Sequence, residues 1–358
     1  MTKDLSPRLI FDGPDLRLVY VPAEKRGPLV VTFSPLVHQD FDPPVGFGQE
    51  FFAKRGLACL CFISAWPHWW QVPDIEKALS IAREVVRQHS RVITYGSSMG
   101  GHGALLHSRA LGATTVIAAA PQFSIDPAKA PFERRWRHRA SKLTFNWDDM
   151  KAGLAPKARK YIIYDPLSID RKHVQRLRSP RIIRVGLPFS GHAPLAYLSH
   201  IGLLSDTILS MIGNKFSLLS LKEAVRAQRR GNPDYWGEMA LALQQRGRYQ
   251  AAVEALRTAK SLDASAIQPR LRLAQNMWRL GLGEEALQEL EEAVTMRPRH
   301  EGARKLFASM LAQSIQSVSE DPAKLEALHE RYRSAIDSDG ELQALISAPK
   351  ATPHLTNG

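Results

Sequence analysis

The first half of the chain alternates short apolar runs with amphipathic stretches. Runs that are apolar at almost every position predict strands buried on both faces, as in a parallel sheet covered by helices. The stretch 74–89 instead repeats apolar residues every three or four positions and predicts a helix. The predicted strands are 8–13, 15–22, 28–35, 57–63, 92–95, 114–120, 161–165 and 181–185. Strands alternating with helices predict a doubly wound, mostly parallel α/β sheet, and the first two strands predict an antiparallel hairpin at its start.

From Phe216 onward the apolar pattern has the period of helices, and the sequence repeats itself. Five sets of small or apolar residues recur with a spacing of 34 residues, which is the tetratricopeptide period. These sets are Ala240, Ala274 and Ala308; Gly247 and Gly281; Ala252 and Ala286; Leu256 and Leu290; and Ala259 and Ala293. The region resembles two full tetratricopeptide repeats, at about 233–266 and 267–300, followed by the first helix of a third. The small residues fall where the two helices of such a repeat cross.

These patterns divide the chain into three parts. The parts are an α/β domain at 1–214, helical repeats at 215–315, and a third part at 316–358 that holds a helix at 321–336 and a disordered tail at 350–358. A helix at 219–229 is expected to cap one end of the repeats, because two repeats alone seldom bury enough surface to be stable.

The repeat region is expected to bind a protein partner and to do no chemistry. Stacked helix pairs form a concave groove whose side chains are free to vary. Arg270, Arg272, Gln275 and Arg279 lie on the predicted groove helix of the second repeat and favour an acidic peptide or a C-terminal carboxylate. Packing of this surface on the α/β domain is the alternative.

Composition places the chain among globular proteins. It has 358 residues, of which 44% are hydrophobic and 23% charged, whereas disordered chains combine few hydrophobic residues with high charge. The formal net charge of +13 favours anionic partners, a class that includes phosphorylated or acidic molecules, nucleic acid and membrane surfaces. A basic protein without such a partner is an equal alternative.

Three features of the sequence predict a cytoplasmic location. The only cysteines, Cys59 and Cys61, are two residues apart on a predicted strand, where they face the same side and cannot form a good disulfide. The N-terminal residues lack the apolar segment of a signal peptide. The longest apolar stretch, 193–212, contains His200 and Asp206, so it predicts a buried helix rather than a membrane span.

One short stretch combines a strand, a tight turn and a helix around a serine. Residues 92–95 are β-branched or aromatic, Gly96 to Gly100 fit the pattern G-x-S-x-G, and an Ala- and Leu-rich run follows. This is the order of the nucleophile elbow, which raises a serine hydroxyl above the end of the sheet. Ser98 is the candidate nucleophile, and a glycine-serine turn of another α/β fold is the alternative. Together with the strand order, the motif makes the region 1–214 resemble the α/β-hydrolase superfamily.

The resemblance implies a triad in the chain order serine, acid, histidine. His192 lies in the loop after the last predicted strand and is the expected general base, with a surface histidine as the alternative. Two carboxylates follow the preceding strand: Asp165 at its end and Asp170 in the next loop. We favour Asp170, because the superfamily's acid usually lies a few residues beyond the strand, and Asp165 remains open. The acid would hold the imidazole in the required tautomer and stabilise its protonated form.

The resemblance also implies an oxyanion hole made of two backbone N–H groups. Met99, which follows the nucleophile, is expected to provide one of them. Ser34 or Leu36, after the third predicted strand, would provide the other, because Pro35 between them has no N–H. The HGGG sequence typical of lipases is absent from the chain.

Aromatic and basic side chains flank the predicted site. A group of tryptophans follows the strand 57–63 at its C-terminal end, the edge where open α/β sheets bind ligands. An insertion at 126–160, where this fold usually carries its lid, contains an arginine-rich stretch that predicts contact with an anionic group. For the tryptophans, the alternative is packing against the sheet edge. For the arginine-rich stretch, the alternative is a solvated basic surface. The candidate substrate-binding residues are Trp66, Trp69, Trp70, Arg135 and Arg137.

These features favour a serine hydrolase that cleaves an ester, a thioester or an amide through an acyl-serine intermediate at Ser98. We expect an acylated or other small-molecule substrate, no metal, no cofactor and no nucleic-acid partner. A scaffold protein with an inactive hydrolase fold is one alternative, although the presence of Ser98, His192 and nearby aspartates argues against it. An acyltransferase that uses an acceptor other than water is the other alternative.

Overall fold

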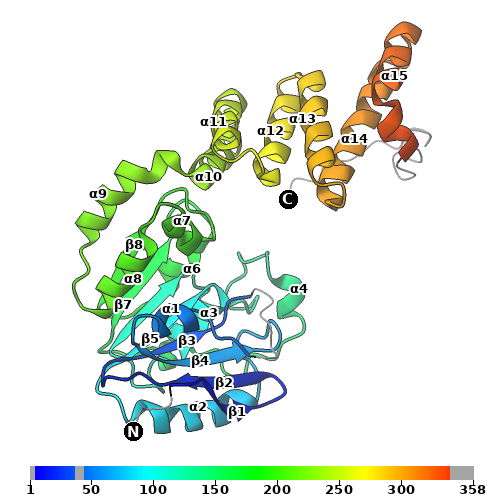
Figure 1. The fold of residues 1–358 in the computed structure, drawn as a ribbon. Helices are drawn as coiled ribbons and strands as arrows, with labels where there is room; N and C mark the ends of the chain where they lie inside the picture. The colour runs from blue at the N-terminus through cyan, green and yellow to red at the C-terminus, as the bar shows by residue number, and fades with distance from the viewer. Residues whose placement is uncertain (1–4, 37–43, 339–358) are drawn as a thin grey trace. The chain divides into compact units, whose positions relative to one another are not determined.

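A computed structural model describes residues 5–36 and 44–338, and the chain divides into two compact units. The first unit ends at Arg229 and the second begins at Arg230 (Figure 1). The first is an α/β domain, and all the regular elements described in the second are helices. The fold class predicted from the sequence is therefore confirmed. The predicted tail at 350–358 lies outside the described residues.

A sheet of eight strands forms the centre of the first unit. The strands are β1 (Arg8–Asp12), β2 (Leu16–Val21), β3 (Leu29–Phe33), β4 (Ala58–Ser64), β5 (Val92–Ser97), β6 (Thr115–Ala119), β7 (Arg159–Tyr164) and β8 (Ile182–Gly186). Their order in the sheet is β1-β2-β4-β3-β5-β6-β7-β8. The pairs β1–β2 and β2–β4 are antiparallel, as the predicted hairpin requires, and the other pairs are parallel. The parallel strands therefore end at one common edge, where their loops can combine side chains into a site.

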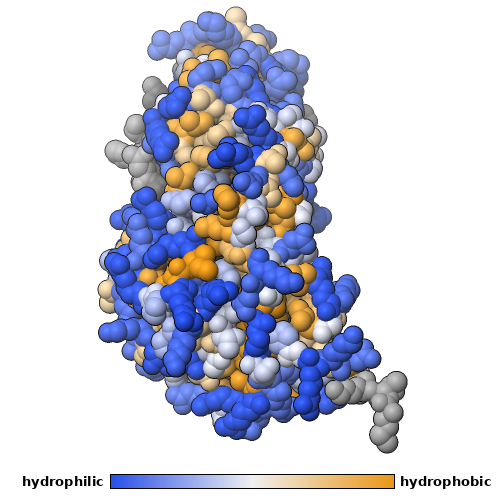
Figure 2. Space-filling view, turned by 90° about the vertical axis from the view of Figure 1, so that its left-hand side faces the viewer, coloured by the Kyte–Doolittle hydropathy of each residue, from blue (hydrophilic) through white to orange (hydrophobic). Residues whose placement is uncertain are grey.

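The helices of this unit include one that the sequence analysis assigned to the repeats. They are α1 (Gln49–Ala53), α2 (Asp74–Val86), α3 (Met99–Leu106), α4 (Arg137–Ala140), α5 (Met150–Gly153), α6 (Asp170–Arg176), α7 (Pro194–His200), α8 (Leu204–Ile212) and α9 (Leu218–Gln228). The boundary between the units lies after α9, whereas the strand pattern predicted it at 214. Side chains of α9 line two pockets together with residues of the α/β domain, which accounts for the difference. Helix α9 lies on the face shown in Figure 2, where hydrophilic side chains surround smaller apolar patches.

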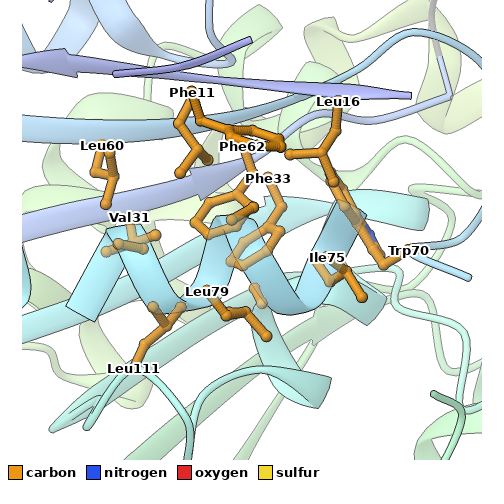
Figure 3. Close-up of a cluster of buried hydrophobic side chains, with 14 of the residues drawn as sticks. Phe11, Leu16, Val31, Phe33, Leu60, Phe62, Trp70, Ile75, Leu79 and Leu111 are labelled. Atoms are coloured by element: carbon orange, nitrogen blue, oxygen red, sulfur yellow. The ribbon is translucent and has the colours of Figure 1, made fainter. Parts of the chain in front are cut away.

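The core beneath the sheet is built from aromatic residues of the central strands and the apolar face of α2 (Figure 3). Phe33 and Phe62 stack with their ring centroids 4.6 Å apart, and Trp70 meets Phe33 edge-on at 5.0 Å. Ile75 and Leu79 extend from α2 into the same cluster. This packing fixes the loop after β4 and the strand β3 that borders β5, so the turn that follows β5 rests on a rigid base.

The apolar stretch 193–212 forms two helices rather than the single one that its composition predicted. Helices α7 and α8 are separated by a bend of 118°. Gly202 lies at the bend with φ of 70°, a left-handed conformation that glycine adopts without steric cost. The Leu203 N–H donates to the Leu198 carbonyl oxygen and closes the end of α7. No single helix in the described part of the chain is long and apolar enough to cross a membrane.

The second unit repeats helix pairs with the predicted period. Its helices are α10 (Pro233–Gln244), α11 (Tyr249–Leu262), α12 (Ile267–Arg279), α13 (Gly283–Met296), α14 (Glu301–Ser317) and α15 (Pro322–Ser338). Gly247 and Gly281 occupy equivalent turns, with φ of 70° and 78°. Ala252 and Ala286 are equivalent residues of α11 and α13, and both are fully buried. This repetition confirms the tetratricopeptide-like architecture.

Candidate active site

Ser98 occupies the sharp turn between β5 and α3. Its backbone φ of 53° and ψ of −119° lie outside the regions that non-glycine residues normally adopt. A Cβ at Gly96 would come within 2.1 Å of the Gly100 carbonyl oxygen, and a Cβ at Gly100 within 2.1 Å of the Phe33 carbonyl oxygen. Both positions therefore need glycine, which explains the spacing of the motif. The Ser98 hydroxyl makes no helix-capping hydrogen bond, so it is available for chemistry.

His192 and Asp170 form a hydrogen-bonded chain with this serine. Ser98 Oγ lies 2.9 Å from His192 Nε2, and His192 Nδ1 lies 2.7 Å from Asp170 Oδ2. The three side chains come from the segments that follow β5, β7 and β8, so the common edge of the sheet brings them together. Asp170 is fully buried, whereas Ser98 keeps 9% of its surface exposed. The geometry is that of a nucleophile, a base and an orienting acid.

Asp165, the alternative acid, lies at the end of β7 and bonds to backbone N–H groups. Its Oδ1 accepts a hydrogen bond from the Leu167 N–H at 2.8 Å, and its Oδ2 accepts one from the Gly191 N–H at 3.0 Å. Gly191 precedes His192 in the chain. Asp165 therefore anchors the backbone of the loop that carries the histidine, while Asp170 contacts the imidazole itself.

A network of charged groups from the 126–160 insertion supports Asp170. The Arg135 Nη2 donates to Asp170 Oδ1 at 2.7 Å and to Glu133 Oε2 at 2.6 Å. The His173 Nε2 lies 2.9 Å from the same Glu133 oxygen, and its Nδ1 accepts the Phe123 N–H at 3.1 Å. The Phe123 contact leaves the His173 proton on Nε2, where it can be donated to Glu133. Arg135, expected to contact substrate, is thus held by Glu133 and Asp170 in an ion-pair network.

The charges of this network keep its carboxylates ionised. Burial alone would raise the pKa of Asp170, but the hydrogen bond from His192 and the charge of Arg135 outweigh burial and lower the pKa. Burial opposes ionisation of Glu133 as well, yet its hydrogen bonds from His173 and Arg135 lower its pKa to about 2. Asp170 therefore faces His192 as an anion, as an acid that stabilises a protonated imidazole must.

The position of the proton on His192 follows from two competing neighbours. His192 Nδ1 lies 2.7 Å from Asp170 Oδ2 and 3.3 Å from Arg135 Nη1. A guanidinium only donates and a carboxylate only accepts, so the two contacts require opposite tautomers. We assign the proton to Nδ1, because the contact with Asp170 is shorter and charge-assisted. The Nε2 lone pair then faces Ser98 Oγ, as a general base requires.

Gln122 is a further contact of Ser98 that the sequence analysis missed. Its Nε2 donates to Ser98 Oγ at 3.2 Å, and its Oε1 accepts the Trp69 Nε1–H at 3.2 Å. The indole N–H can only donate, so it fixes which end of the amide faces the serine. Gln122 is fully buried. Its position shortly after β6, at the edge where the parallel strands end, is the signal that could have revealed it.

Of the three tryptophans expected to line the pocket, only Trp69 lies close to the triad. Its ring is 5.5 Å from that of Trp136, which in turn lies 6.2 Å from the His192 ring. Trp70 is buried in the core, where its Nε1–H donates to the Met99 carbonyl oxygen. Trp66 is 39% exposed and donates to the Asp15 carboxylate. Trp70 therefore packs in the core and does not line the pocket, and Trp66 forms its hydrogen bond elsewhere on the surface.

The backbone donors expected for the oxyanion hole differ in their availability. Met99 is the first residue of α3, where a backbone N–H has no acceptor within the helix. The Ser34 N–H instead donates to the Phe62 carbonyl oxygen at 3.0 Å, so the expected role of Ser34 is corrected. The backbone hydrogen bonds between β3 and β4 continue one residue beyond β3 and include the Ser34 N–H. Leu36, the other residue considered, remains a candidate.

Two further expectations concern Arg137 and a metal site. Arg137 begins α4 and is exposed, and the structure shows no bond from it to Ser98, His192 or Asp170. Across residues 5–36 and 44–338, no three His, Cys, Asp or Glu side chains are arranged to hold a metal ion.

We expect Glu133→Gln to destabilise the protein near neutral pH and to lose much of this effect in acid. The pKa of Glu133 falls from 4.5 to about 2 on folding, so its carboxylate stabilises the fold above the unfolded-state pKa. That contribution is lost as the pH falls through the folded-state value. Denaturant unfolding of both proteins near neutral pH and at about pH 3 should show a smaller difference in unfolding free energy in acid. An equal difference at both pH values would contradict the network.

Comparisons with known proteins give distant likenesses. No family model and no curated protein matches the chain. The Glycosylation Associate Protein complex from Streptococcus agalactiae is 15% identical, with a TM-score of 0.44, over 57% of this chain and 46% of that chain, so this chain spans less than half of it. FphF, a fluorophosphonate-binding serine hydrolase of Staphylococcus aureus, is 12% identical, with a TM-score of 0.41, over 57% of this chain and 98% of that one. The second TPR domain of human RPAP3, solved with an HSP70 peptide, is 17% identical, with a TM-score of 0.24, over 32% of this chain and 92% of that one.

Proposed function

We propose that the protein is a serine hydrolase that cleaves an ester, a thioester or an amide through an acyl-serine at Ser98. The observation that carries the proposal is the chain of contacts from Ser98 Oγ to His192 Nε2 at 2.9 Å and from His192 Nδ1 to Asp170 at 2.7 Å. Strained backbone at Ser98 supports it further, because strain of this kind persists where the surrounding structure holds a reactive side chain in place.

The proposed reaction has two halves. His192 Nε2 takes the hydroxyl proton as Ser98 Oγ attacks the acyl carbon, and the resulting oxyanion accepts a hydrogen bond from the Met99 N–H. The tetrahedral intermediate collapses, and the leaving group departs with the proton from His192. Water then repeats the sequence on the acyl-enzyme, and Ser98 recovers its proton. Throughout, ionised Asp170 stabilises the imidazolium that forms in each half.

Gln122 prepares the serine for the first step. The amide N–H of Gln122 donates to Ser98 Oγ and occupies one lone pair of the hydroxyl oxygen. The hydroxyl proton of Ser98 is therefore directed to His192 Nε2. Trp69 holds the amide in this orientation through its indole N–H. The residue is a positioning group in this account, since it contacts the nucleophile but transfers no proton.

Gln122→Ala should lower kcat by about tenfold, the scale of one neutral hydrogen bond, with a smaller change in KM. Trp69→Phe should lower kcat in the same direction, because the amide loses the donor that fixes it. Steady-state kinetics per folded enzyme measures both effects. Asn276→Ala is the matched control: Asn276 is also a buried amide, and it donates to Gln244 and to the Arg272 carbonyl oxygen within the helical unit. A loss of kcat in Asn276→Ala equal to that in Gln122→Ala would contradict the role.

Turnover of activated acyl esters of increasing chain length, with Ser98→Ala as control, tests the proposed function. Hydrolysis by the wild-type chain that is lost in Ser98→Ala supports the enzyme. A wild-type chain without turnover favours the inactive scaffold, and turnover that Ser98→Ala retains would contradict Ser98 as the nucleophile. Addition of alcohol acceptors separates hydrolysis from acyl transfer, because a transferase partitions the acyl group to the alcohol. The acyl group that the natural substrate carries follows from the chain-length preference.

Recruitment of a protein partner by the helical unit stays a prediction. Two of the arginines expected to make its groove basic bond to other groups of the same unit. Arg270 is buried, and its Nη1 donates to Glu289 at 2.6 Å and to Glu292 at 2.8 Å. Arg272 Nη1 donates to the Gly237 carbonyl oxygen at 3.3 Å. These two arginines join neighbouring helices, so we no longer assign them to an acidic peptide.

A further inference from the structure

A pocket at one edge of the sheet takes no part in the proposed reaction. It has a volume of about 410 Å³ and lies between the ends of β7 and β8 and the helix α9. This volume is within the range of small-molecule sites. Four of its ten lining residues are cationic and none is acidic. The cations are Arg184 of β8 and Lys222, Arg226 and Arg229 on α9 or at its end.

Two of these cations repel one another. Lys222 and Arg226 are one helical turn apart on α9, a spacing at which like charges destabilise a helix. In the described part of the chain, no carboxylate is shown bonded to Arg184, Lys222 or Arg226. Glu223, the neighbour of Lys222, does not line the pocket. An anion between the helix and the strand would relieve this repulsion.

Most of the other lining residues are apolar. Tyr164 and Pro166 approach it from the end of β7, and Leu187 and Pro188 approach it from the segment after β8. These side chains offer contact area to the carbon-bearing part of a ligand, while the cations face its charged part. The pocket lies on the side of the unit that carries α9, the side seen in Figure 2.

We propose that this pocket binds the phosphoryl group of a phosphorylated small molecule. Arg184 and Arg226 present planar guanidinium groups that match phosphate oxygens in bidentate fashion, and Lys222 adds a point charge. A phosphoryl group carries close to two negative charges at neutral pH, which suits several cations better than a single carboxylate would. The assignment is independent of the chemistry at Ser98, so neither depends on the other.

Calorimetric titration of the full chain with inorganic pyrophosphate tests the assignment. Pyrophosphate should bind with saturation, and Arg226→Ala and Arg184→Ala should each weaken binding by about tenfold or more, the scale of a lost charge-assisted hydrogen bond. Both side chains are exposed, so the variants should keep the melting temperature of the wild type. Arg226→Gln, which retains most of the aliphatic stem, should lose affinity in the same way. Arg178→Ala is the matched control, because it removes the same charge from an exposed site outside the pocket.

Three results would overturn the proposal. The first is a wild-type chain that gives no saturable binding of pyrophosphate at millimolar concentration. The second is an equal loss of affinity in Arg178→Ala and Arg226→Ala, which would show a general effect of net charge. The third is binding to vesicles of anionic phospholipid that depends on Arg184 and Arg226 without any binding of pyrophosphate, since the pocket would then serve a membrane surface.

Discussion

Ser98→Ala and His192→Ala should each reduce the turnover of an activated acyl ester by about 10³-fold or more. The first variant removes the atom that forms the acyl bond. The second removes the base 2.9 Å from that atom, which leaves the hydroxyl at its ordinary, weak nucleophilicity. The double variant should be little slower than either single one, because the two residues act as a unit and neither retains its function alone. Steady-state kinetics on purified variants measures these losses.

The neighbouring serine provides the control for this prediction. Ser97 ends β5 and precedes the strained turn, and the structure shows no bond between it and His192. Ser97→Ala should therefore keep most of the activity. If Ser98→Ala retained full turnover while Ser97→Ala lost it, the assignment of the nucleophile would be wrong.

Asp170→Asn should lower kcat by about 10⁴-fold, whereas Asp165→Asn should act mainly on stability. An asparagine at 170 can present its amide N–H to His192 Nδ1, which favours the tautomer whose proton lies on Nε2 and faces the serine. It would also leave Arg135 with Glu133 as its remaining carboxylate partner in the network. Asp165, by contrast, accepts two backbone N–H groups, and its replacement should cost about 1–3 kcal/mol of stability.

Measuring kcat and the free energy of unfolding on both variants separates the two aspartates. A kinetic loss far larger than the loss of stability explains should mark Asp170, and a loss of stability with little kinetic loss should mark Asp165. The opposite ranking, at equal stability, would move the orienting role to Asp165 and would imply that the loop of His192 rearranges when substrate binds.

The sequence was informative about the fold because several independent signals agreed. Buried apolar runs set the strands, Gly96 and Gly100 marked a turn too tight for any side chain, and the 34-residue spacing set the helix pairs. In these cases, neighbours in sequence or a fixed period determined the structure. Asp170 was favoured over Asp165 because the acid of the α/β-hydrolase superfamily, which residues 1–214 resemble, usually lies a few residues beyond the strand.

Other features depend on contacts between distant segments, for which no local pattern exists. Gln122 meets Trp69 across 53 positions and Ser98 across 24, and Glu133 meets His173 across 40. The Ser34 N–H is used because β4 lies beside β3, a pairing that the loop sequence did not reveal. The break in 193–212 comes from Gly202, a residue whose left-handed conformation overrides an otherwise continuous apolar run.

The intact mass of the protein after exposure to a fluorophosphonate, which reacts with serines activated by a base, tests the role of Ser98 directly. We expect one covalent adduct per chain, located on Ser98 by peptide mapping and absent from Ser98→Ala and from His192→Ala. Labelling should slow markedly in Asp170→Asn as well. A folded wild-type chain that takes up no label, or that takes it up equally in Ser98→Ala, would contradict the account.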